Sequence, residues 1–569
     1  MLSTSNKESA IRQRATTISC FGTLLGLCFA MIFCTGLESF AHQTSAQPES
    51  SFQGSVVKDQ GREPLKKATV QIISEDQDAL NYTAVTDQDG HFAVDNMRPG
   101  RYRVFVERTG FIEVGKNHRR SLGTAIALDS GQKLNDFVFR MLPAAVVTGR
   151  VVDEDGDPMP NVEIAVLHYS YSSGARRLEP ERSERTNDLG EYRVGNLSPG
   201  QYFVAASPAP EFISPKVKGP DDPAKKDLGY VTTFYPGTVD RNQATPLQLH
   251  PGDDVPIDFT LVPGHTFHIR GRVTSLAASG GNKPFVMLMP KEIRTVFSAA
   301  EVQADGSFDI PGVAPGSYMI SAVAMDAEHP QSAYQSIDVS GSDVNGIRLA
   351  ASSGSEVRGQ VRVDGVQKPD LSQLTFFLRP VDDDGVSSLD FGYRQTLASV
   401  KPDGSFELKA VPAGVYQLEL EGSSRSMRDY FLKTVVSSGR ESANRILRVS
   451  GGAVISVDVV VSSAGGEITG VAVDEKNQPV ASAMVVAIPD GENNRDRTSY
   501  KQAETDQLGR FNLRGLRPGD YHLMAWDYVE DGAFYDPQFV KPYESPSKAV
   551  HVTERGQEHQ IVRVQHAAE

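Results

Sequence analysis

The chain has few cysteines and a single tryptophan. Of its 569 residues, three are cysteines and one, Trp526, is a tryptophan. Cys20, Cys28 and Cys34 all lie in an amino-terminal segment that we expect to be removed, which leaves no thiol for a disulfide or for nucleophilic catalysis. The stability of the remaining chain must therefore come from hydrophobic cores.

Excess positive charge and helical periodicity are also missing. The net charge of −15 repels nucleic acid, so we expect no nucleic-acid partner. After residue 50 apolar residues rarely recur at helical spacing, and the 50 glycines and 33 prolines of the chain fall mostly where strands would turn. This composition predicts an all-β protein.

The patterns of hydrolytic and phosphate-binding sites do not occur. There is no His-Glu-x-x-His, no Gly-x-Ser-x-Gly and no phosphate loop. His551 and Glu554 have the spacing of half a zinc carboxypeptidase site, but only 15 residues follow Glu554, too few for the domain that would supply a third ligand. We expect an exposed strand there, no enzyme, no cofactor and no metal.

Two weaker metal patterns have ordinary structural explanations. His265 and His268 could share a strand face as a two-ligand site, although a solvated linker is favoured. Asp153, Asp155 and Asp157 alternate as calcium ligands do, and acidic residues recur in TDQDG at residues 86–90. Neither place has the sixth-position glycine and twelfth-position glutamate of an EF-hand, so turn chemistry is the favoured interpretation.

Residues 1–46 have the pattern of an export signal. Lys7, Arg12 and Arg14 precede the apolar run ISCFGTLLGLCFAMIFCTGL, and small-x-small cleavage sites follow. This predicts a secretory signal peptide and places the chain in the periplasm, in the cell envelope or outside the cell. Because the run spans roughly 20 residues, an uncleaved signal anchor in the inner membrane, with the modules outside the cytoplasm, remains an alternative.

What the sequence contains in abundance is one repeated unit. It appears first as TDQDGHFAVDNMRPGRYRVFV at residues 86–106 and returns four times. Asp-Gly and Pro-Gly suit tight turns, and the stretch that follows alternates with period two, as expected of a half-buried antiparallel strand. A tyrosine two residues after the second glycine predicts a tyrosine corner. These tyrosines are Tyr102, Tyr202, Tyr318, Tyr416 and Tyr521.

Each unit also opens with a Gly-x-Val-like strand and closes with a strand, a turn and a strand. The opening glycines are 95, 122, 88 and 111 residues apart, which are lengths of single β-sandwich domains. We therefore expect about five modules in tandem, joined by short linkers as a semi-rigid string. The expected modules 1 to 5 are residues 50–143, 147–264, 267–352, 356–464 and 466–569.

The combined pattern resembles the carboxypeptidase regulatory-like domain, a transthyretin-like sandwich found in bacteria. The likeness is strongest in DQGREPLKKATVQI, DEDGDPMPNVEIAV and DEKNQPVASAMVVA, and it extends over residues 54–566. The resemblance implies seven-stranded antiparallel sandwiches of the prealbumin or immunoglobulin-like type and an accessory, non-catalytic role. Such modules accompany zinc carboxypeptidases or precede outer-membrane transporter barrels, and related sandwiches are classed with carbohydrate-binding-like folds.

Two modules carry additional aromatic loops. Aromatic residues beside Asp, Asn and Gln can stack on sugar rings and bind their hydroxyls. The plainer alternative, which we favour, is that the loops plug the end of their sandwiches. The candidate ligand-binding residues are Tyr230, Phe234 and Tyr235 in module 2 and Trp526, Tyr528, Phe534 and Tyr535 in module 5.

Two classes of function remain from the sequence alone. The first is a non-catalytic exported protein that binds or spaces protein or polysaccharide partners of the envelope or cell exterior. The second is a carbohydrate-binding protein that uses the aromatic loops. An accessory subunit of a peptidase is a more distant alternative, and a membrane contact is expected only through an uncleaved anchor.

Overall fold

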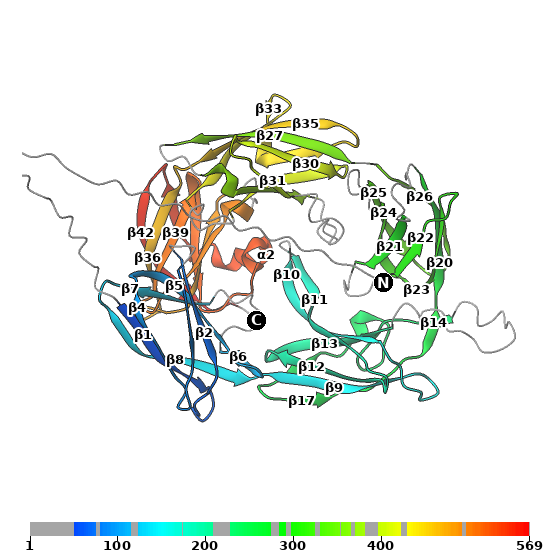
Figure 1. The fold of residues 1–569 in the computed structure, drawn as a ribbon, viewed down its shortest axis with the longest axis horizontal. Helices are drawn as coiled ribbons and strands as arrows, with labels where there is room; N and C mark the ends of the chain where they lie inside the picture. The colour runs from blue at the N-terminus through cyan, green and yellow to red at the C-terminus, as the bar shows by residue number, and fades with distance from the viewer. Residues whose placement is uncertain are drawn as a thin grey trace, which may run out of the picture. The chain divides into compact units, whose positions relative to one another are not determined.

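The chain is built almost entirely of β-strands, which confirms the all-β prediction (Figure 1). The signal prediction lies outside the part of the chain that the computed structural model describes, and in that part no helix has the length and apolar character to cross a membrane. The described residues are 50–75, 80–114, 123–172, 175–208, 228–274, 284–291, 298–324, 331–352, 354–365, 370–381, 397–422, 429–491 and 497–567.

Module 1 is a sandwich of two four-stranded sheets, with strand orders β4-β1-β8-β6 and β3-β2-β5-β7. Burial alternates along the strands of the hairpin, so one face of each sheet turns to the core. The strands are β1 (Ser50–Lys58), β2 (Thr69–Ser74), β3 (Asn81–Val85), β4 (His91–Met97), β5 (Gly100–Glu107), β6 (Phe111–Glu113), β7 (Thr124–Leu128) and β8 (Lys133–Pro143).

Module 2 repeats this plan and adds short strands after β13. Its larger sheet has the order β11-β10-β13-β15, and β9 pairs with β12 in the second sheet. The elements are β9 (Ala145–Val152), β10 (Glu163–Ser172), β11 (Ala175–Arg185), β12 (Glu191–Leu197), β13 (Gly200–Ser207), β14 (Leu228–Tyr230), β15 (Thr233–Phe234), the 3-10 helix η3 (Arg241–Gln243), β16 (Leu247–Leu249), β17 (Asp254–Pro256), β18 (Phe259–Thr260) and β19 (Pro263–His265).

Modules 3 and 4 each have two sheets. Module 3 contains β20 (Phe267–Thr274), β21 (Phe285–Pro290), β22 (Ser298–Glu301), β23 (Ser307–Val313), β24 (Gly316–Ala324), β25 (Gln331–Val339) and β26 (Val344–Ala350). Module 4 contains β27 (Ser355–Asp364), η4 (Leu371–Gln373), β28 (Leu374–Pro380), β29 (Leu397–Ser399), β30 (Ser405–Val411), β31 (Gly414–Gly422), β32 (Phe431–Ser437), β33 (Arg440–Glu441), η7 (Ala443–Arg445), β34 (Ile446–Val449) and β35 (Val454–Ser462).

Module 5 joins its two layers through a parallel contact between β40 and β42. Its strands and short helices follow the same order as in the other modules, with a helical insertion after β40. The elements are β36 (Gly466–Val473), β37 (Met484–Pro489), η9 (Arg497–Ser499), β38 (Lys501–Glu504), β39 (Arg510–Leu516), β40 (Gly519–Trp526), η10 (Ala533–Tyr535), α2 (Pro537–Val540), η11 (Lys541–Tyr543), β41 (Lys548–Val552) and β42 (Gln557–Gln565).

The opening and closing strands of each module run parallel, so the sandwiches are not wholly antiparallel as the sequence predicted. β1 pairs in parallel with β8, and the same pairing recurs as β9 with β17, β20 with β26, β27 with β35 and β36 with β42. β9 with β18 and β40 with β42 are parallel as well, and the other described strand pairs are antiparallel, such as β2 with β5. The hydrophobic pattern alone does not distinguish the two pairings, because each of them alternates inward and outward side chains.

The close strand approach explains the recurring opening glycine. Gly470 lies opposite Phe511 on β39, and a Cβ atom added to it would stand 1.9 Å from the carbonyl oxygen of Gln560 on β42. Gly149 has the same relation to Tyr192 and to a carbonyl of the closing segment, at 1.8 Å. The aromatic ring of the hairpin therefore covers a glycine on the neighbouring strand, and no larger residue fits there.

Five separate cores lie between the sheets. Each draws its buried residues from a single module, for example residues 52–141 for module 1 and residues 468–562 for module 5. The tyrosine-corner prediction is confirmed: the hydroxyl of Tyr102 donates to the carbonyl of Arg98 at 2.6 Å. Equivalent hydrogen bonds are made by Tyr202, Tyr318, Tyr416 and Tyr521. Independent folding of each module stays a prediction.

Candidate functional site

The aromatic loop of module 5 covers the outer face of a sheet. Trp526 is 0% exposed and Phe534 is 2% exposed. Both pack with Met484, Val486 and Met524, which project from β37 and β40 on the side away from the module core. This sheet is therefore buried on both faces, and the insertion that contains α2 supplies the second cover (Figure 1).

The remaining candidates of module 5 are less buried. Tyr535 contacts Tyr500 edge-on at 4.9 Å between ring centroids, and the guanidinium of Arg497 lies 4.9 Å from its ring. Burial raises the pKa of Tyr535 to about 12. Tyr528 is 39% exposed, so among the module 5 candidates it is the one that offers most of its ring to solvent.

Of the module 2 candidates, Phe234 is buried against a sheet, whereas Tyr230 and Tyr235 are only half-buried. Phe234 is 5% exposed and packs on Leu167 and Leu178 of the β10–β11 hairpin. Tyr235 and Tyr230 are half-buried beside the module core. The hydroxyl of Tyr230 donates to Glu154 Oε2 at 2.6 Å; burial, and then this carboxylate, raise the pKa of Tyr230.

The histidine patterns are used for other contacts. His551 Nδ1 lies 2.6 Å from Asp520 Oδ1, while Glu554 contacts Lys433 of module 4 at 3.2 Å. His268 pairs with Asp309 at 2.7 Å, and His265 lies on β19. Among the residues that the structure describes, no group of three or more His, Cys, Asp or Glu side chains is arranged to hold a metal ion.

The alternating aspartates form a turn. Asp153 Oδ1 accepts the backbone N–H groups of Asp155 and Asp157 at 3.0 and 2.8 Å. Asp87 does the same for Asp89 and His91 at 2.9 and 2.8 Å. Both acidic stretches are therefore turns, as predicted. The carboxylate of Asp87 stabilises the turn before β4, and that of Asp153 stabilises the turn between β9 and β10.

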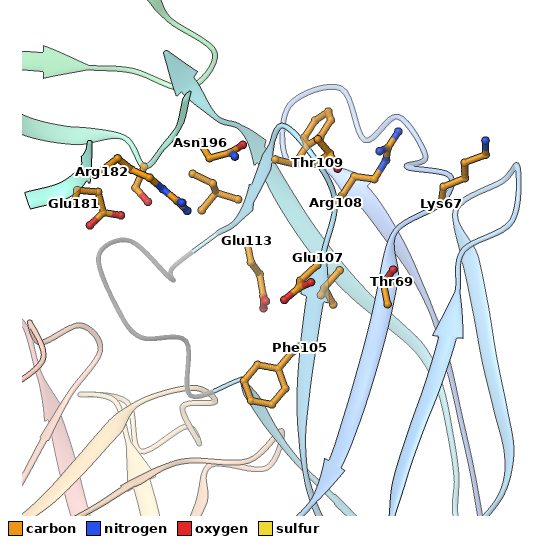
Figure 2. A pocket seen from close by; sticks show the side chains of 14 residues that line it. Lys67, Thr69, Phe105, Glu107, Arg108, Thr109, Glu113, Glu181, Arg182 and Asn196 are labelled. Carbon is orange, nitrogen blue, oxygen red and sulfur yellow. The ribbon is translucent and has the colours of Figure 1, made fainter. Parts of the chain in front are cut away.

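A hollow of about 610 Å³ is lined by residues of modules 1 and 2 (Figure 2). Glu107 and Glu113 lie near its middle, and Glu113 accepts a hydrogen bond from the hydroxyl of Thr124 at 3.0 Å. Lys67, Arg108 and Arg182 contribute positive charge further out. Because both signs are present, the hollow does not select a ligand by charge.

A second hollow of about 460 Å³ is predominantly positive. Arg176, Arg177, Arg241 and Lys291 line it together with one acid, Glu179, which accepts a hydrogen bond from Ser170 Oγ at 2.9 Å. The guanidinium of Arg176 stacks on the ring of Tyr169, 4.8 Å from its centroid, and Tyr169 is 37% exposed. No sequence pattern predicts this group, because its members come from three distant stretches of the chain, and only the pair Arg176-Arg177 stands out locally.

Comparison with known proteins identifies the modules. Residues 51–140 and 146–221 match the sequence profile of the carboxypeptidase regulatory-like domain. These two segments are similar to carboxypeptidase regulatory-like domains. The match covers most of module 1 and module 2 up to residue 221, and modules 3 to 5 repeat the same turn glycines, aromatics and corner tyrosines. No curated protein matches the chain.

Several solved structures share a likeness at low identity. The TIE protein of Bacillus anthracis is 10% identical, with 74% of each chain covered and a TM-score of 0.16. Two B repeats of the collagen-binding protein of Staphylococcus aureus are 9% identical over 73% of this chain and all of theirs, with a TM-score of 0.12. A candidate carbohydrate-binding protein of Pseudomonas aeruginosa is 19% identical over 15% of this chain and 87% of its own, with a TM-score of 0.11. At these TM-scores the likeness identifies neither a function nor a ligand.

Proposed function

We propose that the chain is a non-catalytic, exported scaffold or binding protein of the cell envelope or cell exterior. One observation carries the proposal: several described polar side chains join neighbouring modules to one another. Tyr334 of module 3 donates to the carbonyl of Ala413 in module 4 at 2.9 Å. Arg514 of module 5 contacts Asp429 at 2.8 Å. Regulatory-like domains fit this accessory role, and the export signal predicted for residues 1–46 is the reason for proposing this compartment.

The proposal is tested with the chain that starts after residue 46, immobilised and exposed to envelope extract. One portion of the extract is digested with protease, and another is oxidised with periodate to destroy polysaccharide. A scaffold for proteins retains a saturable partner that only protease removes. Absence of saturable binding from either portion, or turnover of peptide or glycoside substrates by the purified chain, contradicts the proposal. A peptidase that co-elutes in a fixed ratio would instead support the accessory-subunit alternative.

Carbohydrate binding is the second candidate, and the positive hollow favours an acidic glycan. Tyr169 is 37% exposed, and the guanidinium of Arg176, which lies over its ring, supplies donors for carboxylate or sulfate groups. Of the aromatic-loop residues, Tyr528 is placed best for the same purpose because its ring is exposed.

Affinity columns of an acidic and a neutral polysaccharide separate the two sites. Loss of retention on the acidic column in Arg176→Ala supports the hollow, and loss in Tyr528→Ala supports the loop. Equal elution of the unchanged protein from both columns and from bare resin removes the carbohydrate proposal and leaves the scaffold proposal intact.

A further inference from the structure

Two acidic side chains at the turn that starts the hairpin of module 5 are buried, whereas the residues at the same positions of modules 1 and 2 are exposed. The side chains of Glu504 and Asp506 are 1% and 0% exposed. At the position of Glu504, Val85 of module 1 is 59% exposed and the side chain of Arg185 in module 2 is 62% exposed. Asp87, at the position of Asp506, is also exposed. A surface from outside the module therefore covers this turn.

That surface is the outer face of β5 in module 1. Arg103 Nη1 donates to Glu504 Oε2 at 3.3 Å, and Arg101 Nη1 lies 4.0 Å from Asp506 Oδ2. Both arginines also contact Glu75, at 2.5 and 3.2 Å. A buried carboxylate is stable only when it is paired. Arg103 of module 1 pairs with Glu504, whereas Asp506 is held by Arg510 of its own module at 2.9 Å, with Arg101 at the longer distance of 4.0 Å.

Gln507 extends the contact to β7. Its Nε2 donates to the carbonyl of Ala127 at 2.8 Å, and its Oε1 accepts from the backbone N–H of Ala127 at 3.1 Å. β7 is the last strand of its sheet, so these backbone groups face away from β5. The carboxamide takes the place of a residue on a neighbouring strand. The outward-facing Ala125 and Ala127 are only 2% and 9% exposed.

We propose that the outer face of β5 and β7 and the turn at residues 504–507 form a docking interface that holds modules 1 and 5 together in solution. The partner of the module 1 face is thus an acidic turn of the same chain, 380 residues from Ala127. The short linkers predict a semi-rigid string of modules. If that string were extended end to end, modules 1 and 5 could not make this contact. Because the interface contains ion pairs, salt weakens it.

The chain itself provides a matched control. Residues 86–88 and 505–507 both read Thr-Asp-Gln, at the same place in their modules. Gln88 is exposed, whereas Gln507 makes the two hydrogen bonds to Ala127. The same local sequence is therefore used once as a plain turn and once as a docking element, and a substitution of each glutamine separates the two roles.

The first test uses Trp526 as a reporter, because the only tryptophan of the chain lies in module 5. Gln507→Ala and, in module 1, Arg103→Gln are each expected to lower the unfolding midpoint followed by tryptophan fluorescence, by about 5 °C. Gln88→Ala should leave it unchanged. If Arg103→Gln behaves like Gln88→Ala, module 5 does not sense module 1 and the interface does not exist.

The second test follows hydrogen exchange of the β7 amides in the full chain. Docking predicts that the amide of Ala127 is protected and that Gln507→Ala speeds its exchange on the order of tenfold. Rapid exchange at Ala127 in the unchanged protein, or no difference between Gln507→Ala and Gln88→Ala, overturns the proposal.

Discussion

In each module the ring of the corner tyrosine packs in the core, and its hydroxyl donates a hydrogen bond to a backbone carbonyl. Tyr521 is 3% exposed, and its hydroxyl donates to the carbonyl of Arg517 at 2.8 Å. Burial raises the pKa of Tyr521 to about 12, so the hydroxyl remains protonated and able to donate at neutral pH. The sequence repeat predicts this tyrosine and its position, because the hydrogen bond joins residues only four positions apart and so lies within one repeated segment.

We expect Tyr521→Phe to destabilise module 5 by about 1–3 kcal/mol, because the carbonyl of Arg517 loses its partner while the ring remains. Tryptophan fluorescence during urea unfolding measures this change. Tyr528→Phe is the control, since its ring is 39% exposed. Equal unfolding midpoints for the two variants would contradict a structural role for the corner.

Trp526 and Tyr528 lie two residues apart but differ in burial, because Trp526 is 0% exposed and Tyr528 is 39% exposed. We expect Trp526→Ala to cost about 3–5 kcal/mol, because it leaves a cavity under the insertion that contains α2. Tyr528→Ala should change the stability by less than about 1 kcal/mol. Calorimetry of the full chain provides the measurement, as the first variant lacks the fluorescent reporter. A small effect at Trp526 would reopen its assignment as a ligand-binding residue.

Asp305 is expected to titrate below its usual range. The hydroxyl and the backbone N–H of Ser307 donate to its carboxylate at 2.6 and 2.9 Å, which lowers the pKa of Asp305. The turn is therefore stabilised above the unfolded-state pKa of about 3.9, and this contribution is lost as the pH falls through the lower folded pKa. NMR titration of the carboxyl should show a rise in Ser307→Ala; an unchanged pKa would refute the assignment.

At the scale of elements, the opening strand depends on its glycine. Gly470→Ala should destabilise module 5 by about 1–3 kcal/mol or more, because the new methyl meets the carbonyl of Gln560 and the ring of Phe511. Gly451→Ala serves as the control, since its methyl would have Ser352 Oγ as nearest neighbour at 3.6 Å. The melting temperature measured by circular dichroism should be clearly lower for Gly470→Ala than for Gly451→Ala. Equal melting temperatures would show that the strands accommodate the methyl group without loss of stability.

The sheets of module 5 illustrate how an element can be misjudged from its pattern. Inward Val485 and Ala487 alternate with Met484 and Val486, yet all four are buried. A fully apolar strand predicts burial on both faces but not what provides the second cover. The aromatic residues, expected from the sequence to plug the end of the sandwich, instead cover the outer face of β37 and β40.

At the scale of the whole molecule, each module has its own core, and the modules also contact one another through their surfaces. We expect residues 466–569, expressed alone, to unfold cooperatively, because their core contains residues of module 5 only. The unfolding midpoint of this fragment, followed by the fluorescence of Trp526, should nevertheless be lower than in the full chain, because Glu504 loses its ion pair with Arg103. Fluorescence melts of both proteins make the comparison. An unfolded fragment would disprove autonomy, and equal midpoints would argue against docking.

The sequence by itself determined the strand content, the turns, the corner tyrosines and the repeated module, because each depends on residues within one hairpin. The tertiary structure alone decided the parallel pairing of opening and closing strands and the burial of Trp526. It also decided that Gln507 binds Ala127 while Gln88 is exposed. These features depend on which surfaces meet beyond a single hairpin, in the last case 380 residues apart, and a local pattern of turn glycines and alternating apolar residues contains no record of that choice.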